Sequence, residues 1–161
     1  MPGETILKSD GAKLRNPKQR GEWAELRFMA KAAGYGFHLN KPFGESACYD
    51  VVVDLGNRFV RVQVKSTYCR VRSAHRSRSR TAFLAPLRSR KCKPYQLSDF
   101  EFLAVYVIPK DIWYIIPAAV ALRHRSVCMR PGDPRNPYEK YREAWHLLPQ
   151  TRSARRLTTK D

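Results

Sequence analysis

The sequence predicts an α/β fold, and three kinds of pattern support this prediction. A helical repeat of apolar residues runs through residues 17–33. Two short runs rich in β-branched residues, at 49–53 and 59–66, flank the turn-forming residues DLGN and predict a β-hairpin. Apolar runs at 100–108 and 112–116 have the length and composition of buried strands. Since a chain of 161 residues is the size of one domain, we expect a single domain.

The chain is strongly basic. It carries 31 Lys and Arg residues against 14 Asp and Glu residues, a net charge of +17 that favours a polyanionic partner. Hydrophobic residues make up 43% of the chain, so disorder does not account for the charge. No apolar run reaches the length of a membrane span, and the first residues lack the apolar stretch of a signal peptide. We therefore expect no membrane partner and a cytoplasmic location. Cysteines and histidines are scattered, which gives no support to a zinc site or a Ser-His-Asp triad.

The first predicted element is a helix over 17–33, preceded by a loose basic arm at 1–17 and closed by Gly34 as its C-cap. Its predicted apolar stripe consists of Glu22, Leu26, Met29 and Ala33. Glu25 lies at the edge of that stripe and is the candidate for a carboxylate directed at the hairpin. Glu22 is equally eligible, and a solvated surface glutamate is the alternative for either residue.

The hairpin follows a short strand expected at 37–39 and a loop at 40–47. Along its second strand, the period of two separates one face with Val60, Val62 and Val64 from another with Phe59, Arg61, Gln63 and Lys65. Asp50 is expected to meet Gln63 and Lys65 across the ladder. A carboxylate, an amide oxygen and an ammonium group placed together there could hold a hard metal ion beside a phosphate. The same alternation is typical of an ordinary half-exposed sheet, so the pattern alone leaves both interpretations open.

A long basic stretch follows the hairpin. Between residues 55 and 98 there is no acidic residue, while twelve Lys and Arg residues occur. Such an imbalance favours contact with a nucleic-acid backbone over a solvated loop. The candidate DNA-binding residues are Arg61, Arg70, Arg72, Arg76, Arg78, Arg80, Arg88, Arg90 and Lys91. Residues 70–94, rich in Arg and Ser, are expected to form an insertion into the domain.

The C-terminal third returns to globular character. The strands at 100–108 and 112–116 are followed by a short helix that Pro117 opens and that continues to Leu122. Asn136 as N-cap, with proline and glutamate after it, predicts a further helix to about Leu148. The apolar stripe of that helix consists of Tyr141, Ala144, Trp145 and Leu148. A basic tail at 149–161 ends the chain.

Longer strings around these elements resemble a known family. They are GEWAE at 21–25, KPFG at 41–44, YDVVVD at 49–54, RVQVKST at 61–67, FLAVYV at 102–107 and WYIIP at 113–117. They are similar to the PD-(D/E)XK nucleases, and within that superfamily to the homing endonucleases associated with bacterial group I introns. The similarity spans residues 19–148. It implies a restriction-endonuclease-like αβββαβ core, with a mixed central sheet flanked by helices.

The resemblance also implies an active site and a reaction. Its catalytic residues would be Glu25, Asp50, Gln63 and Lys65, and its Mg²⁺ ligands Asp50, Gln63, the Val64 carbonyl and Glu25. Gln63 stands where the superfamily generally has a second carboxylate, and this departure agrees with the intron-associated branch. Glu25 would hold a water beside the metal, and Lys65 would orient the attacking water and stabilise charge on the phosphate.

The implied activity is Mg²⁺-dependent cleavage of double-stranded DNA, with Mn²⁺ as a possible substitute and a homodimer or homotetramer as the working form. Two alternatives remain at this point. The chain could be a catalytically inactive DNA-binding module of the same fold, or a resolvase-like enzyme that acts on branched DNA.

Overall fold

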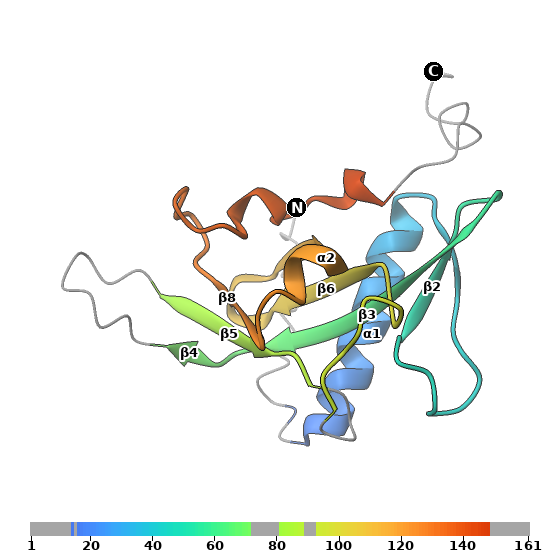
Figure 1. Ribbon diagram of the computed structural model, residues 1–161, viewed down its shortest axis with the longest axis horizontal. Coiled ribbons are helices and arrows are strands. Elements are labelled where there is room, and N and C mark those ends of the chain that lie inside the picture. Colours follow the sequence, from blue (N-terminus) through green and yellow to red (C-terminus); the bar gives the residue numbers. More distant parts are fainter. Residues whose placement is uncertain (1–13, 15, 72–80, 89–92, 149–161) are drawn as a thin grey trace, which may run out of the picture.

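The computed structural model describes residues 14, 16–71, 81–88 and 93–148, and a mixed five-stranded sheet lies at its centre (Figure 1). The strands, in sheet order, are β1 (His38–Asn40), β2 (Val51–Asp54), β3 (Phe59–Thr67), β6 (Phe102–Val107) and β7 (Ile112–Pro117). The β3–β6 pair is parallel and the other pairs are antiparallel. The predicted α/β fold with a mixed central sheet is confirmed. The C-terminal tail and nearly all of the N-terminal arm lie outside the described residues.

A second, three-stranded antiparallel sheet comes partly from the predicted insertion. It contains β4 (Arg70–Val71), β5 (Ala82–Pro86) and β8 (Ser126–Met129) in the order β4-β5-β8. The described part of the connection from β3 to β6 forms β4 and β5 rather than the second helix of an αβββαβ core, and β8 is added from the segment after α2. The short helix α2 (Ala118–Ala121) follows β7, with Pro117 and Leu122 as its caps, as predicted.

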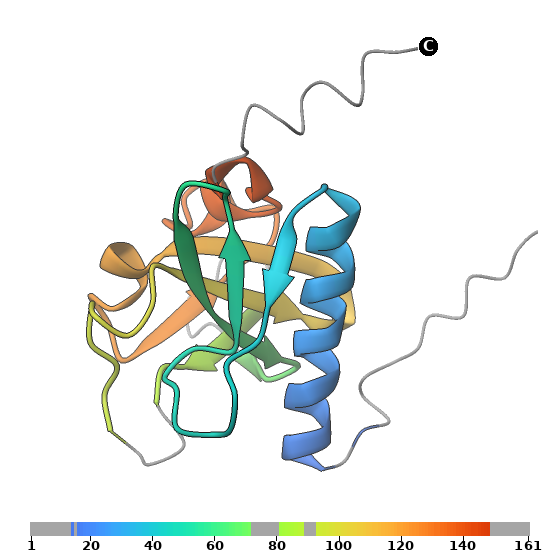
Figure 2. The ribbon, with the colours of Figure 1, turned by 90° about the vertical axis from the view of Figure 1, so that its right-hand side faces the viewer.

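Helix α1 (Pro17–Gly34) lies along one face of the central sheet (Figure 2). The Asn16 side chain accepts a hydrogen bond from the Lys18 N–H at 2.9 Å and caps the helix, and Pro17 occupies its first turn. Its buried apolar residues are Ala24, Phe28 and Ala32, which pack in one cluster with Val60, Val62 and Val64 of β3.

The predicted apolar stripe of α1 was wrong, because Leu26 is 63% exposed and Glu22 also faces solvent. Ala24 and Ala32 are small, so the helix backbone approaches the sheet on their side, with the ring of Phe28 between them. Gly34 belongs to the helix rather than ending it. The left-handed turn beyond the helix is made by Gly36, with φ of 83°.

A second apolar cluster covers the opposite side of the sheet. It joins residues of β6 and β7 to β5, β8 and α2, with Phe83, Phe100, Leu103, Tyr114 and Met129 fully buried. The central strands β6 and β7 are therefore enclosed on both faces, which explains why their sequences are continuously apolar.

The hairpin formed by β2 and β3 is confirmed. Val51 pairs with Val62 and Val53 with Val60, and all four side chains are buried. In the turn, Gly56 adopts φ of 79° and donates its N–H to the Asp54 carboxylate at 2.7 Å.

The predicted helix from Asn136 to Leu148 is wrong. The segment contains two single 3₁₀ turns, η3 (Glu139–Tyr141) and η4 (Trp145–Leu147). Between them the backbone leaves helical geometry: Arg142 forms a β-bridge with Tyr114, and Glu143 adopts φ of 49° while its N–H donates to the Trp113 carbonyl at 2.8 Å. Pairing with the edge strand β7 thus replaces helical hydrogen bonds. The predicted apolar residues of the segment are nevertheless buried.

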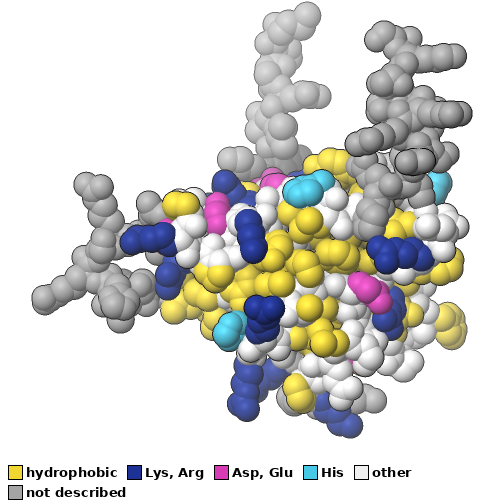
Figure 3. All heavy atoms as spheres, turned by 45° about the horizontal axis from the view of Figure 1, so that its top comes forward, with side chains coloured by type: hydrophobic (Ala, Val, Ile, Leu, Met, Phe, Trp, Pro, Cys, Tyr) yellow, Lys and Arg dark blue, Asp and Glu magenta, His cyan; other side chains and the backbone are white. Residues whose placement is uncertain are grey.

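Among the described residues, no helix has both the length and the apolar composition needed to cross a bilayer. Figure 3 shows the face at the top of Figure 1, where apolar side chains fill the middle and Lys and Arg side chains are spread around the edge.

Candidate active site

The side chain of Asp50 meets two residues of β3 at the end of the hairpin. Asp50 directly precedes β2, and its N–H donates to the Val62 carbonyl at 3.0 Å, which fixes its place opposite Gln63. Its Oδ2 accepts hydrogen bonds from the Val64 N–H at 2.8 Å and from the Gln63 side-chain amide. The predicted meeting of Asp50 with Gln63 is therefore present, and Val64 joins the cluster through its backbone.

The amide of Gln63 lies between two oxygen atoms. Its Nε2 donates to the Asp50 carboxylate and lies 3.2 Å from the Val64 carbonyl oxygen, and the residue is only 6% exposed. In this orientation the amide acts as a donor. A half-turn about the last side-chain bond exchanges nitrogen and oxygen with almost no change of shape, and it would bring Oε1 toward the same place.

These donors fit a hard divalent cation. A carboxylate, an amide oxygen and a backbone carbonyl are ligands that Mg²⁺ accepts, together with water and substrate phosphate. Within the described ranges, no group of three or more His, Cys, Asp or Glu side chains could hold a metal ion. A site at Asp50 would thus use Gln63 and the Val64 carbonyl in place of additional carboxylates.

Glu25 is the helix carboxylate that faces inward. It is 9% exposed, whereas Glu22 lies on the exposed side of α1. Its Oε2 forms an ion pair with Lys41 Nζ at 2.7 Å. Lys41 begins the loop that leads to Asp50. Lys41 begins the KPFG string that resembles the family, but the sequence did not predict its contact with Glu25, because an apolar helix repeat contains no signal for such a contact.

Lys65 lies two residues beyond Gln63 on the same face of β3, as the alternation predicted. Its Nζ donates to the Arg88 carbonyl at 3.2 Å and stands 5.3 Å from the ring centroid of Tyr95. The Tyr95 ring in turn packs edge-on against Phe100, with centroids 5.2 Å apart. Tyr95 is a residue near the candidate site that the sequence pattern did not indicate.

Arg61, a predicted DNA-binding residue, is engaged within the protein. Its guanidinium pairs with the Glu101 carboxylate at 2.5 Å and donates to the Ser98 carbonyl at 2.8 Å. The hydrogen bond from Arg61 lowers the pKa of Glu101, against the opposing effect of its partial burial. This pair joins the end of the connection before β6 to the first part of β3.

Two other predicted DNA-binding residues, Arg70 on β4 and Arg88 after β5, are exposed. The remaining ones lie outside the described residues: Arg72, Arg76, Arg78, Arg80, Arg90 and Lys91. DNA contact by this whole set stays a prediction.

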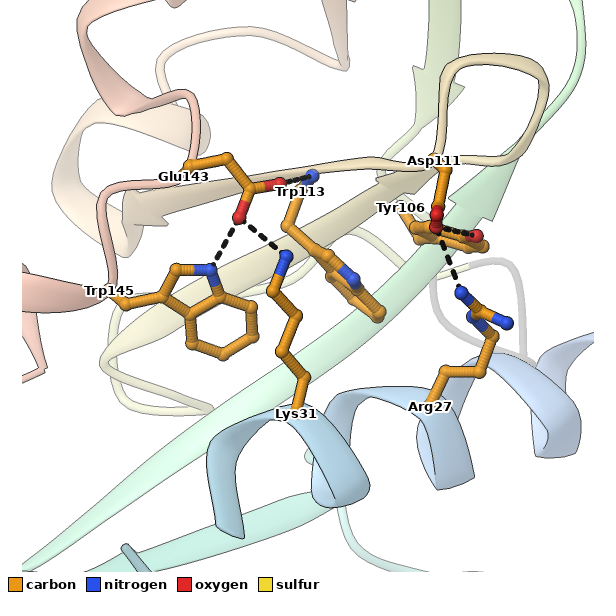
Figure 4. A network of polar contacts seen from close by, with 7 residues as sticks. All are labelled: Arg27, Lys31, Tyr106, Asp111, Trp113, Glu143 and Trp145. Carbon is orange, nitrogen blue, oxygen red and sulfur yellow. Dashed lines mark hydrogen bonds and ion pairs between the residues drawn. The ribbon is translucent and has the colours of Figure 1, made fainter. Parts of the chain in front are cut away.

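A network of polar contacts holds the outer side of α1 to the sheet (Figure 4). Arg27 pairs with Asp111 at 2.8 Å, and the same carboxylate oxygen accepts from the Tyr106 hydroxyl at 2.6 Å. Burial, together with this hydrogen bond, raises the pKa of Tyr106 well above its usual value.

Further along the helix, Lys31 pairs with Glu143 at 2.7 Å. The Glu143 carboxylate also accepts from the Trp113 N–H and from Trp145 Nε1, each at 2.7 Å. The helix that carries Glu25 is thereby fixed to β7 and to the C-terminal segment.

The likeness to a homing endonuclease of known structure agrees with this architecture. The chain resembles the structure of a bacterial homing endonuclease, I-Ssp6803I, with 25% sequence identity and a TM-score of 0.67, over 89% of this chain and 98% of that one. Hjc, a Holliday junction resolvase from Archaeoglobus fulgidus, matches with 12% identity and a TM-score of 0.42, over 69% of this chain and 84% of that one. No curated protein sequence matches the chain. The family model for PD-(D/E)XK endonucleases matches residues 15–148, which include Glu25, Asp50, Gln63 and Lys65. The chain therefore belongs to the PD-(D/E)XK endonuclease family, and its fold is restriction-endonuclease-like.

Proposed function

We propose that this protein is a Mg²⁺-dependent endonuclease that hydrolyses phosphodiester bonds in duplex DNA. The observation that carries the proposal is the meeting of Asp50, Gln63 and Val64 at one end of the β2–β3 hairpin, inside the segment that matches the family model. In hydrolysis, a water oxygen forms a bond to phosphorus while the bond from phosphorus to the leaving oxygen breaks.

Each residue of the candidate site would have a role that follows from its chemistry. Asp50, the turned amide of Gln63 and the Val64 carbonyl would hold the divalent ion, with Glu25 beside them. The ion would supply Lewis-acid stabilisation of the charge that develops on the phosphate. Lys65, held by the Arg88 carbonyl and the Tyr95 ring, would orient the attacking water and bring positive charge to the phosphate. Glu25 would accept a hydrogen bond from a water once the Lys41 ammonium shifts toward substrate.

The proposed substrate is double-stranded DNA, because the net charge of +17 favours a polyanion. Two exposed arginines also lie near Lys65: Arg70 follows it in the sequence, and the Arg88 carbonyl accepts its hydrogen bond. The likeness to a homing endonuclease, at 25% identity, supports a homing-type activity. A homodimer or homotetramer as the working form is part of the same proposal. Mn²⁺ would substitute for Mg²⁺, and the protein would act in the cytoplasm.

The direct test is incubation of the purified protein with supercoiled plasmid in Mg²⁺, in Mn²⁺ and in EDTA. We expect nicked and linear plasmid with either metal and none in EDTA. Asp50→Ala and Lys65→Ala should each abolish cleavage but retain the gel shift of duplex DNA, whereas Lys110→Ala, at an exposed position on the 3₁₀ turn η2 (Ile108–Lys110), should cleave normally. Cleavage that survives both Asp50→Ala and Lys65→Ala would refute this site.

A second candidate is a catalytically inactive DNA-binding module. It is favoured by Gln63, which provides an amide where a second carboxylate would bind metal more strongly, and which donates to Asp50 in this structure. A protein that shifts duplex DNA but never nicks it with either metal would support this candidate. Cleavage restricted to four-way junctions would support a resolvase-like enzyme instead.

A further inference from the structure

The loop between β1 and β2 connects two parts of the candidate active site. Lys41 at its start is paired with Glu25, and Asp50 at its end contacts Gln63 and Val64. In Figure 2 the loop projects past the ends of β1 and β2, beside the N-terminal half of α1. A side chain on this loop therefore belongs to the segment that joins two residues of the candidate active site.

Phe43 lies in this loop, two residues after Lys41, and its ring is wholly in solvent. Its relative exposure is 104%, the highest among the exposed large hydrophobic residues of the described chain. Aromatic side chains of this size are usually at least partly covered by the protein that carries them. The next residue, Gly44, adopts φ of 77°, a left-handed conformation that turns the backbone sharply just after the ring.

Ion pairs on both sides of Phe43 hold the loop against one helix. On one side Lys41 binds Glu25 at 2.7 Å, and on the other Glu45 binds Lys18 at 3.4 Å. Both Glu25 and Lys18 belong to α1. The loop is thus attached two residues before and two residues after Phe43, and the ring is directed outward by a supported backbone.

We propose that Phe43 is a DNA-inserting side chain, whose ring enters a base step close to the bond that is cut. This inference rests on the proposed nuclease function and adds a contact that would widen or unstack the duplex beside the active site. Apolar wedges of this kind act on DNA by entering a base step, and a flat ring stacks on any base. A protein partner would need a contiguous apolar patch, whereas the residues after Phe43 in the loop, Gly44, Glu45 and Ser46, are small or polar and exposed.

The test compares binding to two short fluorescent duplexes in EDTA, one intact and one with a central abasic site where a base step is already open. We expect the wild-type protein to bind the abasic duplex more tightly than the intact one. In Phe43→Ala this preference should fall by about fivefold or more, because fivefold corresponds to the lower end of the free energy of one aromatic–base stack. Phe59→Ala removes another exposed ring, 66% exposed at the start of β3, and should keep the preference. Because Phe43 makes no core contact, the melting temperature of Phe43→Ala should equal that of the wild type.

A second measurement reports on the ring itself. In Phe43→Trp, the added indole emission should be quenched when the abasic duplex binds, and in Phe59→Trp it should not. An unchanged preference in Phe43→Ala together with unquenched Phe43→Trp would overturn the inference. Plasmid cleavage by the wild type is measured separately. If the wild type cleaves plasmid, an unchanged preference and an unquenched Phe43→Trp refute the insertion of Phe43 but not the nuclease function. If the wild type neither cleaves nor binds DNA, both proposals are refuted.

Discussion

Replacing Gln63 by glutamate would convert the proposed site into one with two adjacent carboxylates. In the structure, Gln63 donates a hydrogen bond to the Asp50 carboxylate from a position only 6% exposed. Gln63→Glu removes that bond, and a hydrogen bond to a charged group contributes about 1.5–3 kcal/mol. It also places two negative charges in contact, so we expect a loss of at least about 2 kcal/mol of unfolding free energy.

That loss should appear as a lower melting temperature in EDTA, by roughly 4–8 °C for a chain of this size. Added Mg²⁺ should stabilise Gln63→Glu more than it stabilises the wild type, because two carboxylates bind the ion more tightly than one. An ion present at 100 times its dissociation constant stabilises the folded state by about 2.7 kcal/mol, so the Mg²⁺-dependent rise should be larger in Gln63→Glu than in the wild type.

The assay is thermal unfolding in EDTA and over a Mg²⁺ titration, and it needs no DNA. Gln96→Glu is the matched control, since it makes the same chemical change at an exposed position and should show neither effect. Equal melting temperatures of wild type and Gln63→Glu in EDTA would contradict the contact between Gln63 and Asp50. Equal shifts with Mg²⁺ would refute the placement of the ion between these two residues.

Three further predictions test other parts of the structure. Tyr95→Leu should slow plasmid cleavage without weakening the gel shift of duplex DNA, and Tyr95→Phe should restore the rate, because the ring face rather than the hydroxyl contacts Lys65. Glu101→Gln should cost up to about 1 kcal/mol at pH 7, since the ion pair is partly exposed. Since the hydrogen bond from Arg61 lowers the folded-state pKa of Glu101, this difference should be full above the pKa of the same carboxyl in the unfolded chain and should be lost as the pH falls through the folded-state pKa, measured by urea unfolding at a series of pH values. Phe28→Ala should cost about 3–5 kcal/mol, while Leu26→Ala should stay within about 0.5 kcal/mol; similar losses would contradict the helix face described.

The part of the site that was predictable from sequence is the part governed by strand geometry. A period of two and a short turn are enough to place Asp50 opposite Gln63, and both the hairpin and this meeting are confirmed. The same rule placed Lys65 on the face of Gln63. Local backbone geometry decides these contacts, so no knowledge of distant segments was needed.

Other features depend on tertiary packing, which local patterns do not contain. Helix α1 has apolar residues at helical spacing on two sides. The side that contains Ala24 and Ala32 packs on the sheet, whereas the sequence repeat predicted the side that contains Leu26. The C-terminal segment has a good N-cap in Asn136, yet pairing of Arg142 with β7 prevented a continuous helix. The Lys41–Glu25 ion pair likewise joins two elements whose relative position only the fold determines.

The parallel pairing of β3 with β6 bears on how the protein folds. Asp50 and Gln63 are 13 residues apart, so the hairpin can close over a short loop. The strand that covers its other edge comes much later: Glu101, just before β6, binds Arg61 across a separation of 40 residues. Contacts between distant residues form slowly because a long loop must close first. We therefore expect the ligands of the proposed metal site to come together early, and the sheet that shields them to be completed in the slower phase of folding.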